Sequence, residues 1–174
     1  MKITLLAMTQ PVAPLRDVYP DAREDQLVGT PQEQLIEAAG RTCYDSMGKG
    51  RPSDQYHAHL LDAEHGSVLE HVTFTWRIEG VSRNLTHELI RHRVGTAISQ
   101  RSTRYCDEGG AKVVRHPAEV KYCEGPGIEI ENDAAILLLL LNKVPLKQRR
   151  AAAARYLPHG IETELVWSCN VRTL

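Results

Sequence analysis

The sequence is poor in several features that mark large classes of protein. Aromatic residues make up 5% of the 174 residues and include a single Phe. The formal net charge is -1, whereas proteins that bind nucleic acid usually carry a clear basic excess. Proteins that bind single-stranded nucleic acid also stack the bases on aromatic side chains, which are scarce in this sequence. An RNA-binding function is therefore disfavoured, and we expect no nucleic-acid partner.

Long apolar runs are also missing. The run from Ala134 to Leu141 has eight residues, far fewer than the roughly 20 that span a bilayer. The N-terminal run, residues 2–8, is too short for the core of a signal peptide and predicts a buried first strand. We therefore expect no membrane partner and a cytoplasmic location.

Cysteine is scarce, and the four residues form no CxxC pair and no metal-like grouping. The segment "HELIRH" invites a zinc interpretation, but His87 and His92 would lie about 140° apart on a helix. We expect no metal site. Cys106 lies near arginines that would favour its thiolate, but no base accompanies it. The cysteines, which we interpret as reduced thiols, are Cys43, Cys106, Cys123 and Cys169.

The common glycine-rich motifs do not occur. The sequence contains neither GxGxxG nor GxxxxGK[ST], so the usual dinucleotide and P-loop cradles are excluded. It also lacks the GxSxG elbow of many hydrolases. Any phosphate must be held by another arrangement of donors.

Local patterns predict a single α+β domain over residues 1–174, with strands and helices segregated. Thr30 as N-cap, Pro31 and Glu33 predict a helix over 30–46. A second helix over 53–64 would be capped by Ser53, and a third over 82–93 by Ser82. Further helices are predicted over 133–143 and 144–158.

Strands are predicted in the segments between and after these helices. Residues 71–81 alternate apolar and polar side chains, which indicates a half-buried strand that Gly80 ends. A turn and short strand are expected within 106–114, and residues 163–170 predict a closing strand. On the helix over 82–93, we expect Leu85 and Leu89 to face the core.

Charged and hydroxyl side chains are concentrated in "ELIRHRVGTAISQRSTRY", residues 88–105. Glu88 and Arg91 are spaced i,i+3 and share a helix face, whereas His92 and Arg93 point in two other directions. The segment "SQRSTRY" mixes guanidinium and hydroxyl groups, which suits a phosphate. Ordinary solvated arginines on a surface helix are the alternative. Ser102 has no evident base, so holding an anion is favoured over nucleophilic attack.

A second polar cluster precedes the alternating strand, in "HGSVLEH". Its His65, Ser67, Glu70 and His71 would lie at the entrance of that strand. Capping or core roles for the two histidines are the alternative. The segments "HxSxxEH", "EGVSRxLTHxLxRHR", "QRSTRY" and "LP…TELVWSCNVR" occur in this order, and together they resemble the flavin-dependent thymidylate synthases. The resemblance extends from about Thr30 to Leu174.

The resemblance implies a fold with a central, mostly antiparallel sheet flanked by helices, assembled as a homotetramer with active sites between subunits. It implies an enzyme that moves a methylene from methylenetetrahydrofolate to C5 of dUMP and reduces it through FAD and NADPH. This chemistry needs orientation and a polarised uracil rather than a protein nucleophile. A non-catalytic flavin- or nucleotide-binding homologue is the alternative.

The resemblance also assigns residues. Arg91 falls at a position that contacts both FAD and the nucleotide. The implied cofactor-binding residues are His65, Ser67, Glu70, Arg91, His92, Arg93, Asn170 and Arg172. The implied substrate-binding residues are Glu88, Arg91, Gln100, Arg101, Ser102, Thr103, Arg104 and Arg155.

The chain departs from the family pattern in several places. The gap between "RHR" and Ser102 is one residue longer than usual, and the spacing around Arg155 is one residue shorter. Ala97 or Ile98 stands where the family often has an aromatic residue. Glu88 replaces a common Gln and can accept hydrogen bonds from sugar hydroxyls. We therefore expect that UMP is accepted beside dUMP, as in UMP/dUMP 5-methylases of nucleoside-antibiotic pathways.

The last departure concerns the family's uracil-binding arginine. In the family, this arginine follows on a helix beyond the position of Leu174. We expect the sequence to be a part of a longer protein whose C-terminal helical part is missing. An incomplete catalytic site is the alternative.

Overall fold

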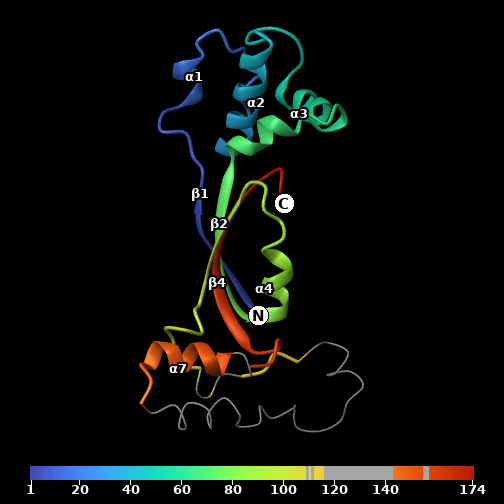
Figure 1. The fold of residues 1–174 in the computed structure, drawn as a ribbon. Coiled ribbons are helices and arrows are strands. Elements are labelled where there is room, and N and C mark those ends of the chain that lie inside the picture. The colour runs from blue at the N-terminus through green and yellow to red at the C-terminus, as the bar shows by residue number, and fades with distance from the viewer. Residues whose placement is uncertain (109, 111, 116–142, 155–156) are drawn as a thin grey trace. The chain divides into compact units, whose positions relative to one another are not determined.

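The computed structural model describes residues 1–108, 110, 112–115, 143–154 and 157–174 (Figure 1). Residues 133–142 of the helix predicted over 133–143, and the predicted substrate residue Arg155, lie outside them. The strands are β1 (Lys2–Met8), β2 (Thr73–Ser82), β3 (Thr96–Gln100) and β4 (Glu162–Asn170). The helices are α1 (Leu15–Val18), α2 (Pro31–Cys43), α3 (Ser53–Asp62), the 3₁₀ helix η1 (Gly66–His71), α4 (Arg83–Leu89) and α7 (Leu146–Ala153).

The four strands form one sheet in the order β1-β2-β4-β3. The N–H of Val171 donates to the Val72 carbonyl at 2.9 Å, and the Thr75 and Ser168 hydroxyls lie 2.8 Å apart. Residue numbers thus rise along β2 while they fall along its partner β4, so the two strands are antiparallel. The same reversal relates β4 to β3. The α+β class with a mostly antiparallel sheet is confirmed.

Two of the predicted helix starts are confirmed in atomic detail. The Thr30 hydroxyl accepts the Glu33 N–H at 3.3 Å, while the Glu33 carboxylate accepts the Thr30 N–H at 2.8 Å. This capping box begins α2, and the hydrogen bonds from Thr30 lower the pKa of Glu33. The Ser82 hydroxyl accepts the Leu85 N–H at 3.2 Å and begins α4. Both starts depend on residues within one helical turn, which is why the sequence predicts them.

The first strand is present but is not buried. Ile3 is 54% exposed and Leu6 is 52% exposed. The prediction of a buried strand is wrong because β1 is an outer strand of the sheet. An apolar run indicates burial only where another layer covers both faces.

Two predicted boundaries also need correction, and one strand was not predicted. Ser53 does not cap α3, because its hydroxyl donates to the Glu37 carboxylate at 2.5 Å and Pro52 occupies the cap position. Strand β2 does not end at Gly80, which adopts a φ of +68° inside the strand. Strand β3 was not expected from the sequence. This strand has five residues, and its position in the sheet is set by pairing with β4.

Helix α4 ends at Leu89, so Arg91, His92 and Arg93 follow the helix instead of completing it. Its buried face is centred on Thr86, whereas Leu85 is 43% exposed. The expectation that Leu85 lies on the core side is therefore wrong. The reason is a tertiary contact: the Gln100 Nε2 donates to the Thr86 hydroxyl at 2.9 Å and draws that face inward.

The described residues form two compact units. Unit 1 comprises Met1–Thr4, Arg77–His92 and the described part of Ile98–Val166. Unit 2 comprises Leu5–Trp76, Arg93–Ala97 and Trp167–Leu174. The core of unit 2 consists of Ile36, Tyr56, Leu60, Val68 and Val72. Buried apolar residues of unit 1 include Ile78, Val81, Ile161 and Leu165.

A buried ion pair organises the helical part of unit 2. The Arg41 Nε donates to Glu37 Oε1 at 2.7 Å, and the two side chains are 1% and 0% exposed. The second oxygen of Glu37 accepts the Leu27 N–H at 3.0 Å and the Ser53 hydroxyl. The Arg41 guanidinium lies 4.2 Å from the centre of the Tyr56 ring. It also donates to the carbonyls of Ser46, Lys49 and Arg51.

We predict that Glu37→Gln lowers the free energy of unfolding by about 3–5 kcal/mol, because it leaves the Arg41 charge buried without its partner. Urea unfolding followed by circular dichroism measures this loss. Asp45→Asn is the matched control, because Asp45 forms an i,i+4 pair with Lys49 that is solvent-exposed on both sides. A similar unfolding midpoint for the two variants would show that the buried pair does not organise this unit.

Candidate functional site

Six residues predicted to bind the cofactor belong to unit 2, on three segments that are distant in the sequence. Glu70 of η1 accepts a hydrogen bond and forms an ion pair with Arg172, which follows β4. Gly66 lies against the same guanidinium: a Cβ at Gly66 would lie 3.0 Å from Arg172 Nε. The Arg172 guanidinium is therefore held between Gly66, at the start of η1, and the Glu70 carboxylate. The six residues are His65, Ser67, Glu70, Arg93, Asn170 and Arg172.

The turn after Arg93 is tied to the end of β4. Gly95 has a φ of +65°, and a Cβ there would overlap with the Asn170 side chain. The Asn170 N–H donates to the Gly95 carbonyl at 3.0 Å. The Thr173 hydroxyl lies 2.8 Å from both the Val94 carbonyl and Asn170 Oδ1.

Asn170 itself is buried, with 7% exposure, and its Oδ1 also accepts the Thr173 N–H at 3.1 Å. Its side-chain oxygen is thus engaged inside the protein. In this structure, Asn170 orients the turn that follows Arg93. Its predicted contact with the cofactor stays a prediction. Thr173 was missed by sequence reasoning, because a single Thr near a strand end carries no local signal.

His65 lies in an aromatic cluster of unit 2. Its ring stacks on Tyr44, with centres 5.9 Å apart and planes at 18°, and it meets His59 edge-on at 6.1 Å. These three rings line a cavity of about 290 Å³ that also contacts Arg51 and Tyr56. Such a cavity suits a planar ring with an anionic group. Sequence analysis did not identify Tyr44 or His59, which belong to no recognised motif segment.

The predicted substrate residues that the structure describes belong to unit 1. Glu88 and Arg91 face one another, with 4.0 Å between Oε2 and Nη1. The i,i+3 pairing is confirmed, although α4 ends between them. Both side chains are mostly exposed, so each remains accessible to a ligand. The predicted substrate residues in this unit are Glu88, Arg91, Gln100, Arg101, Ser102, Thr103 and Arg104.

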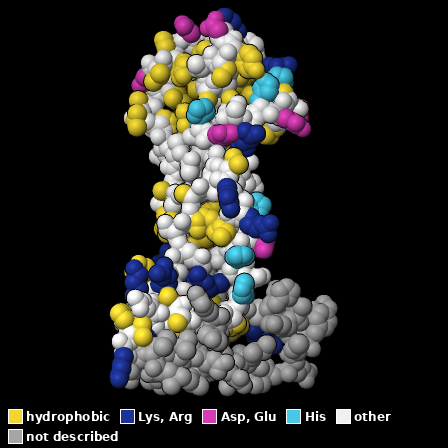
Figure 2. Space-filling view, viewed as in Figure 1, with side chains coloured by type: hydrophobic (Ala, Val, Ile, Leu, Met, Phe, Trp, Pro, Cys, Tyr) yellow, Lys and Arg dark blue, Asp and Glu magenta, His cyan; other side chains and the backbone are white. Residues whose placement is uncertain are grey.

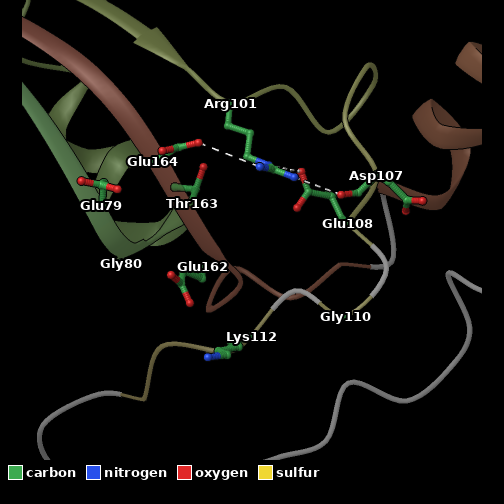
Figure 3. A pocket seen from close by; sticks show the side chains of 10 residues that line it. All are labelled: Glu79, Gly80, Arg101, Asp107, Glu108, Gly110, Lys112, Glu162, Thr163 and Glu164. Carbon is green, nitrogen blue, oxygen red and sulfur yellow. Dashed lines mark hydrogen bonds and ion pairs between the residues drawn. The ribbon is translucent and has the colours of Figure 1, made fainter. Parts of the chain in front are cut away.

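Arg101 lines an acidic cavity of about 390 Å³, with its guanidinium directed toward Glu108 and Glu164 (Figure 3). Its Nε lies 3.3 Å from Glu108, and its Nη1 lies 3.9 Å from Glu164. The Glu108 carboxylate raises the pKa of Arg101, and Arg77 lowers the pKa of Glu164. Because its charge is matched within the protein, Arg101 is a poorer candidate for a phosphate than its neighbours. Its substrate-binding role stays a prediction.

Gln100 and Thr103 line a different cavity, also of about 390 Å³. The Gln100 Nε2 donates to the hydroxyls of Thr86 and Thr163, at 2.9 and 3.3 Å, so its side chain is fixed. The Ser102 hydroxyl accepts the Arg104 N–H at 3.2 Å, which closes a tight turn. Among these residues, Gln100 and Thr103 thus line one cavity and Arg101 lines the other.

The described residues contain no group of three or more His, Cys, Asp or Glu side chains that could hold a metal ion. In the same part of the chain, no helix has the length and apolar character needed to cross a membrane.

Comparison with known proteins shows that residues 26–174 match the family model described as thymidylate synthase complementing protein. A flavin-dependent thymidylate synthase of Mycobacterium marinum is 36% identical over 168 residues, which cover 80% of this chain and 63% of the relative. The relative from Mycobacteroides abscessus is 36% identical over 191 residues and covers 99% of this chain and 74% of its own length. The chain thus spans about two thirds of the length of such relatives.

Solved structures show the same fold. The thymidylate synthase X of Helicobacter pylori, crystallised with FAD and dUMP, superposes with a TM-score of 0.57 at 22% identity. The match covers 99% of this chain and 80% of the crystallised one.

A strained backbone alone costs about 1–3 kcal/mol. We predict that Gly95→Ala destabilises the protein by more than this, because the added Cβ also overlaps with the Asn170 side chain. Urea unfolding measures the loss. Gly50→Ala is the matched control, with a φ of +74° and no atom within 4 Å of the added Cβ. The second change Asn170→Ala should restore part of the loss in Gly95→Ala. Equal effects of the two glycine substitutions would contradict the close contact.

Proposed function

The chain belongs to the family of thymidylate synthase complementing proteins, and from this premise we propose that it is a flavin-dependent pyrimidine-nucleotide methyltransferase. The proposed reaction adds a methyl group to C5 of a uridine monophosphate. FAD is the proposed cofactor, with methylenetetrahydrofolate as carbon donor and NADPH as reductant. The observation that carries the proposal is the gathering of residues 65–70, 93–95 and 170–173 in unit 2.

The residues of unit 2 fit the proposed cofactor. Arg172 lies against Gly66, where an added Cβ would come within 3.0 Å of Arg172 Nε, a tighter contact than usual. Guanidinium groups form paired, charge-assisted hydrogen bonds with phosphates, which suits the pyrophosphate of FAD. The exposed part of Arg172 leaves donors for such a ligand, while Glu70 holds the guanidinium in place. When bound, the flavin would supply hydride transfer to the substrate carbon.

The residues of unit 1 fit the nucleotide. Arg91 is a mostly exposed cation, and Glu88 beside it offsets part of its charge. Gln100 and Thr103 line a cavity that is large enough for part of a nucleotide. The protein's proposed part in the reaction is to orient the pyrimidine and its phosphate, without a covalent step on a side chain.

We also propose that the protein assembles as a homotetramer in the cytoplasm. The exposed apolar side chains of the outer strand β1 support the assembly, since a monomer would leave them in water. These side chains are Ile3, Leu5, Leu6 and Met8.

We predict that the purified protein retains FAD, and that Arg172→Gln weakens this binding about tenfold or more through the loss of charge-assisted hydrogen bonds. Flavin fluorescence quenching measures the affinity, and bleaching of the flavin band by NADPH reports the redox step. Arg23→Gln is the matched control, because Arg23 also pairs with a carboxylate, Asp25, in unit 2. No FAD binding by the wild type would refute the proposed cofactor. Bleaching without nucleotide turnover would favour a non-catalytic flavoprotein.

We predict that the enzyme methylates UMP as well as dUMP, because the exposed Glu88 carboxylate can accept a hydrogen bond from the ribose 2′-hydroxyl. Glu88→Gln should lower kcat/KM for UMP more than for dUMP, by about fivefold or more. The two kcat/KM values, measured for wild type and variant, give this ratio. An unchanged ratio would exclude Glu88 as the specificity residue, and absence of UMP turnover at saturation would refute the wider substrate range.

A further inference from the structure

Residues 102–106 form a tight turn in unit 1, which carries the predicted substrate residues Ser102, Thr103 and Arg104. The Cys106 N–H donates to the Ser102 carbonyl at 2.9 Å, and the Arg104 N–H donates to the Ser102 hydroxyl at 3.2 Å. Both bonds lie within the turn, so they set its shape but not its place on the protein. The place of the turn depends on contacts with other segments.

The first of these contacts joins the turn to the sheet. The Arg101 N–H donates to the Glu164 carbonyl at 3.0 Å, and its guanidinium donates to the Asp107 carbonyl at 3.1 Å. The same guanidinium pairs with Glu108 and Glu164, as Figure 3 shows. Arg101 thus connects both sides of the turn to β4.

The second contact comes from α7, which lies 45 residues away in the sequence. The Arg150 Nη1 donates to the Tyr105 carbonyl at 2.8 Å, and its Nη2 lies 3.8 Å from an Asp107 carboxylate oxygen. The Lys147 Nζ lies 4.6 Å from the centre of the Tyr105 ring. Lys147 and Arg150 are spaced i,i+3, so one face of α7 presents both cations to the turn.

The contact of Arg150 differs from an exposed ion pair. Its side chain is only 22% exposed, and its shortest bond goes to a backbone carbonyl. A largely buried guanidinium that binds the main chain restrains the backbone itself, whereas a pair of exposed side chains restrains little. Arg150 therefore restrains the turn more strongly than Lys147, which contacts the ring of a mostly exposed Tyr105.

The turn also needs a restraint because like charges meet there. Lys147 and Arg104 both act on the Tyr105 hydroxyl, and Lys147 is the main cause of its lowered pKa. Figure 2 shows Lys and Arg side chains gathered in the region of α7. These cations repel one another, and Asp107 offsets part of their charge through Arg150. The bond from Arg150 to the main chain keeps the turn in place against this repulsion.

We propose that Arg150, assisted by Lys147, is a positioning residue for the nucleotide. Helix α7 holds the turn of residues 102–106 where its Ser102 and Arg104 meet the substrate. This inference rests on the proposed function and adds two residues that act on the substrate through the turn. A turn that is ordered before the ligand arrives loses less conformational entropy on binding.

We predict that Arg150→Met weakens dUMP binding to the FAD-loaded full chain about tenfold, because the ligand must then order the turn. The kcat at saturating dUMP should change less than about twofold, because the lost restraint serves the ground state and the transition state equally. Isothermal titration and steady-state kinetics measure the two quantities. Arg150→Lys, which retains the charge beside Asp107, should recover part of the affinity. Lys147→Met should weaken binding less than Arg150→Met.

Gln148→Met is the matched control, because Gln148 is an exposed residue of the same helix. Its dUMP affinity should equal that of the wild type. The FAD affinity of Arg150→Met should also be unchanged, since α7 contains none of the predicted cofactor residues. A parallel loss of FAD affinity, or a lower kcat at unchanged dUMP affinity, would overturn the positioning role.

A double-mutant cycle separates an action through the turn from a general loss of structure. Arg104→Gln removes a predicted substrate contact of the turn. If Arg150 acts through the turn, Arg150→Met should weaken dUMP binding less in the Arg104→Gln background than in the wild type. Losses of affinity that simply add would count against the proposal.

Hydrogen exchange tests the restraint without any ligand. The amides of Arg104 and Cys106 bind Ser102, and they should exchange about tenfold faster in Arg150→Met. Unchanged exchange there would overturn the restraint. A wild type that binds neither dUMP nor UMP would refute the proposed function. A wild type that binds dUMP no more tightly than Arg150→Met would refute the positioning role alone.

Discussion

The pairing of β4 with its two neighbours is the constraint on which both candidate sites depend. In unit 1, the Arg101 N–H donates to the Glu164 carbonyl, which sets where residues 100–104 leave β3. In unit 2, the Asn170 N–H donates to the Gly95 carbonyl, which sets the turn after Arg93. A shift of one residue would invert every side chain of β4 and separate these partners. The register of one strand therefore decides which predicted residues can act together.

The arginines differ in how far a carboxylate of the protein neutralises and buries them. The buried ones stabilise the fold, whereas the more exposed ones are the candidates for binding an anion. Arg41 is buried with Glu37, and Arg101 is matched by Glu108 and Glu164. Arg172 is paired with Glu70 but stays half exposed, with its position fixed by that carboxylate. An arginine already oriented by a carboxylate loses less conformational entropy when it binds an anion. The exposed pairs are thus prepared for binding in a way that isolated surface arginines are not.

The buried pair in unit 2 connects stability with the aromatic cavity. Arg41 holds the carbonyls of residues 46–51 and lies on the Tyr56 ring. The same loop contributes Arg51 to the cavity that His65 lines. Gln26 and Arg23 also bind this loop, through the Gly48 N–H and the carbonyls of Lys49 and Gly50. The ion pair and these hydrogen bonds offset the cost of burying the two charges.

The sequence by itself determined the features that depend on neighbours within one helical turn or one strand. The Thr30–Glu33 capping box, the Ser82 cap, the strand over 163–170 and the Glu88–Arg91 pair follow from local spacing and are confirmed. The family motifs also identified the residues that gather in each unit, although their contacts with ligands stay predictions.

Only the tertiary structure decided how those residues are used. The exposure of β1, the early end of α4, the pairing of Arg101 with Glu164 and the meeting of His87 with His159 have no local signal. The two side-chain pairings join segments that are distant in the sequence, and the exposure of β1 depends on whether another layer covers the strand. Periodicity and capping rules act over a few residues, whereas these contacts are set by strand register and by packing of distant segments.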